Sequence, residues 1–319
     1  MIIFSKVNLL QNPDIYIKWK QCADLPEVLY DASAILVDKF VYTGGGTCQI
    51  IGGFDNEFTI LKYDYTNDTW CSLPKLSRHK FALASYKGQL VVIGGAVPAN
   101  VSGRWKAQYC DSLLVWDDKA HKWTEPYPPL QDTCMQPSAV GYGIHIAVAG
   151  GTNTNTLDSV EVFDGNSNQW YRASPLPCKV YCATAALLHN TWYIMGGFGL
   201  KKGVCHISLP SLIAEAVETK GKRMCKWESL PNTEFSYATA AAFGDSLLAI
   251  GGSKSIGVTD AIHVYFPGKK MWVPVEESLP YPFGGSVAVV LPTEELLLIG
   301  GATDMVRYKH TFQGVLKLS

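Results

Sequence analysis

Two glycine clusters lie close together in the stretch FVYTGGGTCQIIGGF, which runs from Phe40 to Phe54. A strand followed by glycines can begin a phosphate-binding loop, because glycine lets the backbone approach an anion closely. Such a loop must lead into the N-terminus of a helix, whose free N–H groups bind the anion. No helical pattern follows these clusters, and the similar GFGLKKG of residues 197–203 also lacks a following helix. We therefore interpret the glycines as structural, since they permit sharp turns and close backbone packing.

The histidines and cysteines show no metal-binding pattern. The seven histidines are scattered without a His-x3-His or Glu-x-x-His spacing, and the nine cysteines contain no Cys-x-x-Cys pair. We therefore expect reduced thiols, no metal, no cofactor and no catalytic residues. A Ser/His/Asp or Cys/His triad has no local spacing, because its members meet only in the folded chain, so the sequence leaves that alternative open.

The composition is that of a globular protein with a sizeable core. Hydrophobic residues make up 47% of the 319 residues and charged residues 17%, and the net charge is −1. This balance gives no bulk attraction to nucleic acid or to a membrane surface. No apolar run approaches the roughly 18 residues of a membrane-spanning helix, and the N-terminus lacks the pattern of a secretory signal. We expect a cytoplasmic monomer.

Three periodic marks run through the chain. The first is a short apolar run that ends in a glycine pair, at Gly44–Gly45, Gly94–Gly95, Gly150–Gly151, Gly196–Gly197, Gly251–Gly252 and Gly300–Gly301. The second is a series of tryptophans in phase with these pairs: Trp19, Trp70, Trp123, Trp170, Trp227 and Trp272. The third is an aromatic residue seven positions before four of these tryptophans, as in Tyr63/Trp70. A period of about 50 residues marks a repeat architecture.

Each repeat is interpreted as four strands, because apolar or alternating runs are separated by turn residues. The glycine pair, the aromatic-x6-Trp spacing and the period resemble the kelch repeat. This resemblance covers nearly the whole chain and implies an all-β fold, a β-propeller of four-stranded blades around a central channel. Six marks predict a six-bladed β-propeller, in which the periodic tryptophans pack between blades.

We expect the N-terminal strand to close the ring. The sixth glycine pair is followed by only one further strand, in Tyr308–Leu318, and the run DIYIKWKQ around Trp19 would supply the missing fourth strand. The predicted domain is a single propeller over residues 1–319. Its blades lie at about 27–73, 78–126, 136–175, 180–230, 236–276 and 284–319, with residues 15–22 completing the last.

One segment, from Ser208 to Trp227, departs from the repeat. Its run SLIAEAVE predicts a short helix that begins at Ser208 or Ser211. In a kelch ring it would lie on the face opposite the loops that follow the glycine pairs. We interpret it as a tolerated insertion, although a second partner site is an alternative.

Kelch propellers of ubiquitin-ligase adaptors bind peptides on the face that gathers the post-Gly-Gly loops. Carried to this chain, the resemblance places an inner ring fourteen residues before each first glycine, at Tyr30, Lys80, Gln136, Cys182, Tyr237 and Ser286. In the adaptors several of these positions hold arginine or serine, whereas only Lys80 is basic here, so their specificity is not carried over.

The outer loops add further candidates: Arg104, Trp105, Lys106, Lys201, Lys202, Lys254, Arg307 and Lys309. They outnumber the acids Asp55, Glu57 and Asp304. Trp105 lies out of phase with the repeat, in the longest post-Gly-Gly loop, and is either an exposed anchor or a residue that packs its own loop. We expect this mouth to bind another protein through an acidic or phosphorylated peptide, as a non-catalytic scaffold or adaptor.

Two other functions are alternatives. Some kelch proteins cross-link actin filaments, and others are enzymes. Copper oxidases of the family use a larger propeller with Tyr and His ligands. The iron-dependent specifier proteins carry Glu-x3-Asp-x3-His, where this chain has Glu27 and Asp31 but Ile35 in place of the histidine. Six-bladed sialic acid epimerases are exported proteins. An enzyme acting on a sugar or small ligand in the channel would need converging acids, bases or metal ligands, which the inner ring lacks.

Overall fold

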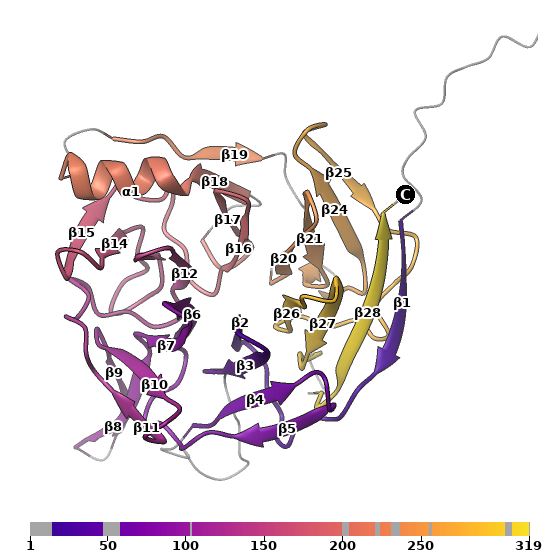
Figure 1. Ribbon diagram of the computed structural model, residues 1–319, viewed down its shortest axis with the longest axis horizontal. Coiled ribbons are helices and arrows are strands. Elements are labelled where there is room, and N and C mark those ends of the chain that lie inside the picture. The colour runs from indigo at the N-terminus through magenta and orange to yellow at the C-terminus, as the bar shows by residue number, and fades with distance from the viewer. Residues whose placement is uncertain are drawn as a thin grey trace, which may run out of the picture.

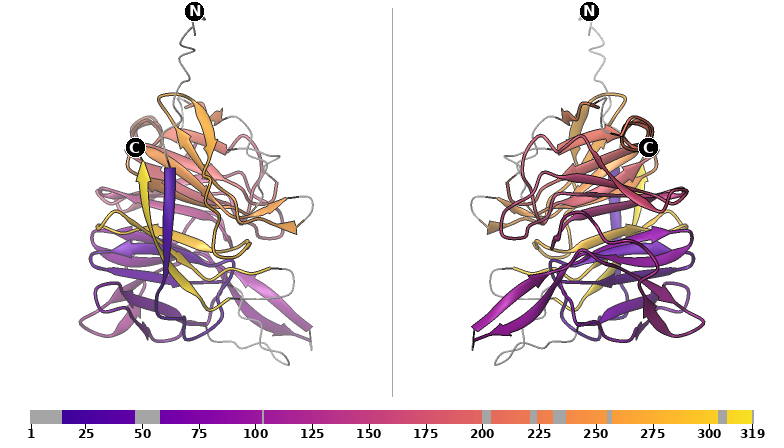
Figure 2. Two further views of the ribbon diagram at one scale, coloured as in Figure 1. Left: turned by 90° about the vertical axis from the view of Figure 1, so that its right-hand side faces the viewer. Right: turned by 90° about the vertical axis from the view of Figure 1, so that its left-hand side faces the viewer.

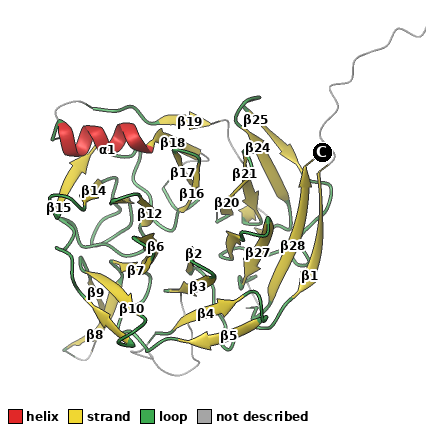
Figure 3. Cartoon of the chain, in the orientation of Figure 1, coloured by secondary structure: helices red, strands yellow, loops and turns green. Residues whose placement is uncertain are grey.

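The computed structural model describes residues 15–46, 58–102, 104–199, 204–220, 224–230, 237–254, 257–303 and 308–318. Strands dominate this part of the chain, with a single helix at the rim (Figure 3). Six sheets of four antiparallel strands are arranged around a central channel, and each sheet forms one blade (Figure 1). The expected all-β, six-bladed β-propeller is thereby confirmed. No described helix is long and apolar enough to cross a membrane.

The blades follow the order of the repeats, and the first strand of each lines the channel. Blade one contains β2 (Ser33–Val37), β3 (Phe40–Gly44), β4 (Ile60–Asp64) and β5 (Thr69–Ser72). Blade two contains β6 (Ala82–Tyr86), β7 (Gln89–Ile93), β10 (Leu113–Asp117) and β11 (Lys122–Thr124). Blade three contains β12 (Ser138–Tyr142), β13 (His145–Ala149), β14 (Val160–Asp164) and β15 (Gln169–Ala173).

The second half of the chain repeats this arrangement. Blade four contains β16 (Thr184–Leu188), β17 (Thr191–Met195), β18 (Val204–Ser208) and β19 (Glu228–Leu230). Blade five contains β20 (Thr239–Phe243), β21 (Ser246–Ile250), β24 (Ile262–Phe266) and β25 (Met271–Pro274). Blade six contains β26 (Val287–Val290), β27 (Glu295–Ile299), β28 (Thr311–Leu318) and β1 (Ile15–Gln21).

Strand β1 closes the ring, as expected from the sequence. It pairs antiparallel with β28 along its whole length, from Ile15 opposite Leu318 to Gln21 opposite Phe312. Strands from the two ends of the described chain therefore lie side by side in one sheet (Figure 1). This pairing covers the edge of β28 and joins the ends of the repeat.

The glycine pairs allow neighbouring blades to approach through their backbones. Gly94 has φ +62°, and a Cβ atom there would lie 2.5 Å from the carbonyl oxygen of Cys134 in the next repeat. The following Gly95 donates its N–H to the same oxygen at 2.8 Å. The same inter-blade bond joins Gly301 to Leu29, across the closure of the ring, at 3.1 Å. Glycine is required because a side chain would displace this contact.

The periodic tryptophans pack in the hydrophobic clusters of the blades, as predicted, and five of the six also connect their blade to the segment before it. Their indole Nε1–H groups donate to backbone carbonyls far away in sequence: Trp19 to Ser278, Trp70 to Ala23, Trp123 to Pro74, Trp170 to Pro128 and Trp227 to Ser174, at 2.9–3.2 Å. The residue seven positions earlier lies directly opposite across the last hairpin, as for Tyr63 and Trp70, whose ring centroids are 4.6 Å apart. The repeat spacing is therefore the spacing of a cross-strand aromatic pair.

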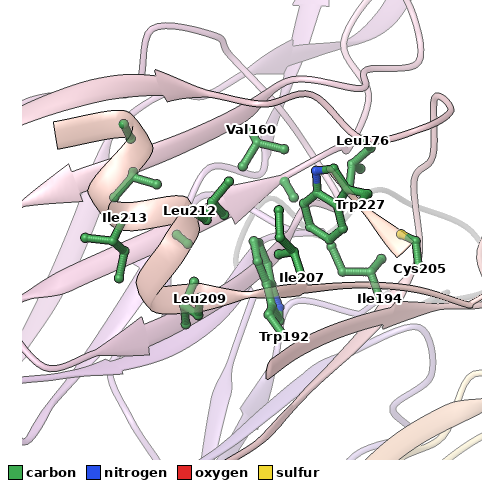
Figure 4. Close-up of a cluster of buried hydrophobic side chains, with 14 of the residues drawn as sticks. Val160, Leu176, Trp192, Ile194, Cys205, Ile207, Leu209, Leu212, Ile213 and Trp227 are labelled. Carbon is green, nitrogen blue, oxygen red and sulfur yellow. The ribbon is translucent and has the colours of Figure 1, made fainter. Parts of the chain in front are cut away.

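The single helix, α1 (Leu209–Glu218), begins after Ser208, whose hydroxyl accepts a hydrogen bond from the Ser211 N–H. This cap and the position between β18 and β19 confirm the prediction. The helix nevertheless contributes to the core, because Leu209 and Leu212 pack with Trp192 between blades three and four (Figure 4). The buried Glu215 carboxylate accepts hydrogen bonds from the Ser174 hydroxyl and the Cys225 N–H, both at 2.9 Å.

Two β-ribbons replace the irregular loops expected after the second and fifth glycine pairs. Strands β8 (Ala96–Val101) and β9 (Arg104–Tyr109) pair over six positions, and β22 (Ser253–Lys254) pairs with β23 (Gly257–Val258). The alternation that indicates a strand is weak in AVPANV and RWKAQY, and the neighbouring Gly and Pro favour a loop. Both ribbons project on the same side of the propeller (Figure 2).

Candidate functional site

The channel mouth is formed by one residue per blade, just before each innermost strand. These six residues have left-handed backbones, with φ between +53° and +65°: Asp31, Lys80, Gln136, Cys182, Tyr237 and Gly285. We call them the mouth ring. Counting fourteen residues back from the first glycine of each pair identified four of these six residues. In blade one the spacing to the first glycine is one residue shorter, and in blade six it is one residue longer. The ring therefore contains Asp31 and Gly285, where the count assigned Tyr30 and Ser286.

Backbone hydrogen bonds connect the mouth ring from blade to blade. The Gln136 N–H donates to the Lys80 carbonyl at 2.6 Å, and the Cys182 N–H donates to the Gln136 carbonyl at 3.3 Å. The Asp31 N–H donates to the Gly285 carbonyl at 2.9 Å, across the closure of the ring. Each bond fixes a left-handed residue, so the mouth is held by the fold rather than by its side chains.

Below the mouth ring lies a cavity of about 340 Å³, lined by the innermost strands of all six blades. Small side chains dominate its described wall, such as Ala34, Ala139, Ala185 and Ala240. Small residues are favoured because six strands converge on one axis. Asp31 is the one ionisable carboxylic acid among the described lining residues, and no lysine, arginine or histidine is among them.

Three titratable groups around the mouth, Cys182, Tyr237 and His79, favour their neutral forms. Burial, followed by the nearby Asp31 charge, raises the pKa of the Cys182 thiol to about 12. Burial also raises the pKa of Tyr237. Burial lowers the pKa of His79 to about 4, and the neighbouring Lys80 acts in the same direction. At neutral pH, Cys182 is therefore a thiol and Tyr237 a phenol, so neither is an activated nucleophile or base.

The described residues contain no group of three or more His, Cys, Asp or Glu placed to hold a metal ion. The eight cysteines in the described ranges carry free thiols. They range from the exposed Cys71 to the buried Cys22, Cys134 and Cys205.

Comparison with known proteins gives relatives of one kind. No family model matches the sequence. Kelch repeat and BTB domain-containing protein 2 of Pongo abelii is 27% identical over 194 residues, which are 57% of this chain and 29% of that protein. Human (Homo sapiens) kelch-like protein 23 is 21% identical over 255 residues, 77% of this chain and 42% of that protein. Human kelch-like protein 33 is 31% identical over 134 residues, 41% of this chain and 24% of that protein.

These matches span less than half of each relative's own length. Among solved structures, that of YjhT superimposes with a TM-score of 0.73 and 16% identity, and the match covers 93% of this chain and 97% of YjhT. At that identity the likeness concerns the fold alone. This chain is a six-bladed β-propeller that is similar to kelch-repeat proteins.

The predicted binding residues of this propeller fall into three groups, two of which lie in the described part of the chain. Lys80, Gln136 and Tyr237 belong to the mouth ring, and Tyr30 directly precedes it. Arg104, Trp105 and Lys106 lie on β9, and Lys254 lies on β22, both in the projecting ribbons. Lys201, Lys202 and Arg307 fall outside the described residues. Trp105 lies opposite Asn100 in the β8–β9 pairing.

Two functional candidates were missed by the sequence analysis. Tyr181 directly precedes the mouth ring in blade four, and Phe198 directly follows that blade's glycine pair. They form an isolated β-bridge, and their rings stack with centroids 5.0 Å apart. Phe198 also contacts Tyr237 of blade five edge-on, at 4.5 Å. The available signal was an aromatic residue after Gly-Gly, a position that is small in most other repeats.

Proposed function

We propose that this propeller is a non-catalytic protein-interaction module that binds a peptide segment of another protein at the channel mouth. The observation that carries this proposal is the ordered mouth ring with its polar and aromatic side chains, above a cavity whose described wall is mostly small and uncharged apart from Asp31. The ring offers backbone and side-chain polar groups, and charged residues such as Lys80 stand among them. Loops on a rigid scaffold commonly carry recognition.

The finer part of the proposal is an acidic or phosphorylated peptide. Lys80 in the mouth ring and Lys106 on the projecting β9 are basic residues of the described face. Charge-assisted hydrogen bonds from lysine would give affinity for a carboxylate or phosphate. Asp31, in the adjacent blade one, adds one negative charge to the ring, so we expect the acidic groups to bind at Lys80 and Lys106 rather than beside Asp31.

The test is affinity capture from cell extract followed by mass spectrometry. The double variant Lys80→Glu and Arg104→Glu should lose the partners that the wild type retains. The matched control is Lys87→Glu. Lys87 is exposed at the other end of β6 and is also left-handed, with φ +51° against +54° for Lys80. If the double variant keeps the partners, or if Lys87→Glu loses them, the mouth is not the binding face.

A further inference from the structure

Three aromatic rings lie together at the edge of the mouth, where blade four meets blade five. Tyr181 and Phe198 are nearly parallel, at an interplanar angle of 24°, and Tyr237 stands at 86° to Phe198. Phe198 is 41% exposed, whereas Tyr181 and Tyr237 are half-buried. We call these three residues the aromatic shelf. Its exposed ring adjoins the cavity, because Tyr237 is also a lining residue.

The fold does not require an aromatic residue at Phe198. The same bridge, between a residue before the mouth ring and one after the glycine pair, occurs in three other blades. The residue after the glycine pair is Ala96 in blade two, Thr152 in blade three and Ala302 in blade six. Small side chains therefore suffice for the bridge. The exposed phenylalanine in blade four is therefore not explained by the needs of the fold. Exposed apolar surface beside a cavity is typical of an interaction site.

Phe198 is held rigidly before any ligand binds. Its N–H donates to the Tyr181 carbonyl at 2.9 Å, and the Tyr181 N–H donates back to the Phe198 carbonyl at 3.2 Å. Glycines with positive φ flank it, at +76° for Gly197 and +101° for Gly199. A side chain at Gly199 would overlap the Lys179 carbonyl. Because the shelf is already ordered, binding to it costs little conformational entropy.

The charged residues beside the shelf indicate which type of residue would lie next to the bound side chain in the peptide. Lys179 is exposed, and its backbone packs against Gly199, the residue after Phe198. Lys80 belongs to the same hydrogen-bonded part of the mouth ring as Gln136 and Cys182, which follows Tyr181. Asp31, in blade one, acts electrostatically on both Cys182 and Tyr237. We therefore expect the acidic residue of the ligand on the Lys179 side of the shelf. A carboxylate next to the bound side chain would therefore complement the lysines.

We propose that the aromatic shelf is an anchor for one large apolar side chain, aromatic or aliphatic, in a peptide of another protein that carries an acidic residue beside it. This inference rests on the proposed function, since it names the side chain that the mouth recognises. Rigid aromatic residues at the centre of an interface contribute much of the binding energy.

The test uses a phage-displayed library of random linear peptides, selected on the wild-type protein, with the most enriched peptides then synthesised. We expect a consensus that pairs a large apolar residue with Asp or Glu. Phe198→Ala should bind these peptides about 30-fold more weakly, whereas Phe198→Tyr should retain binding. The control is Met271→Ala on β25, because Met271 is 42% exposed and lies outside the shelf. Alanine at position 198 should keep the backbone bridge and the fold, because Ala96 and Ala302 form the same bridge in blades two and six.

The outcomes separate this inference from the proposed function. Enriched peptides that bind Phe198→Ala as well as the wild type, but fail to bind Lys80→Glu, would overturn the anchor and leave the mouth as the binding face. A library that enriches nothing on the wild type would overturn both. Self-association of the wild type that Phe198→Ala abolishes, seen by sedimentation velocity, would assign the shelf to a second copy and also overturn the anchor.

Discussion

At the scale of single residues, the repeat depends on backbone positions that only glycine occupies without strain. Gly94 and Gly143 both have positive φ, at +62° and +58°, but their surroundings differ. A Cβ at Gly94 would lie 2.5 Å from the Cys134 carbonyl, whereas none of the described neighbours lies within 4 Å of a Cβ at Gly143. Alanine variants at these two positions therefore separate the cost of the inter-blade contact from the cost of backbone strain.

We expect Gly143→Ala to lower the free energy of unfolding by about 1–2 kcal/mol, the cost of a left-handed alanine. Gly94→Ala should cost at least about 1 kcal/mol more, because the neighbouring blade must also move. Denaturant unfolding of both variants measures the difference. Equal losses would mean that the glycine pairs are needed only for their dihedral angles.

His79 predicts a pH dependence of stability. Its pKa falls from an ordinary 6.5 to about 4, because burial and the Lys80 charge disfavour the imidazolium. As the pH falls, the unfolded chain therefore protonates His79 at a higher pH than the folded chain does. The stability that the neutral imidazole contributes is fully present above pH 6.5 and is lost towards pH 4.

We expect wild type to lose more stability than His79→Gln between pH 6.5 and pH 4, where His79 titrates. The neutral glutamine removes the titration while the backbone bridge to Ala96 stays possible. Melting temperatures of both proteins across this pH range provide the measurement. Parallel curves would show that His79 titrates normally in the folded protein.

At the scale of elements, the closing strand β1 is the strand of blade six that is distant in sequence from the other three. Strand β1 pairs with β28 over seven positions and buries Ile17. Trp19 in the same strand donates its indole N–H to the Ser278 carbonyl in the segment that leaves blade five. Without β1, blade six would have three strands and an open edge.

Deletion of residues 1–22 should lower the melting temperature by on the order of 10 °C, because paired backbone and buried apolar surface are lost together. Deletion of residues 1–14 alone is the matched control, since it keeps the whole of β1. An unchanged melting temperature after the longer deletion would show that the ring is held without this strand.

The elements also show what the sequence predicts well. Blade number, strand order, closure and the α1 cap follow from local signals: the glycine pairs, the aromatic-x6-Trp spacing and Ser208. The core role of α1 was missed, because its burial depends on Trp192 and on the neighbouring blade, which no local pattern encodes. The β8–β9 ribbon was missed because Gly and Pro in that segment favour a loop.

At the scale of the whole molecule, the site is harder to predict than the fold. A constant count along the repeat found four of the six mouth-ring residues, but a one-residue difference hid Asp31 and Gly285. The aromatic shelf combines Tyr181 and Phe198 with Tyr237 from the next blade, so it exists only once the ring has formed. Its sequence signal is a departure from the repeat, and a search for the repeat itself passes over such departures.

The central claim is that recognition takes place at the channel mouth. Hydrogen–deuterium exchange, with and without a captured partner peptide, tests it most directly. We predict slower exchange around Lys80, Gln136, Cys182 and Tyr237, and unchanged exchange in the hairpin turns at Asp68 and His121, which belong to the outer strands. Slower exchange in those outer turns, with the mouth ring unaffected, would contradict the account.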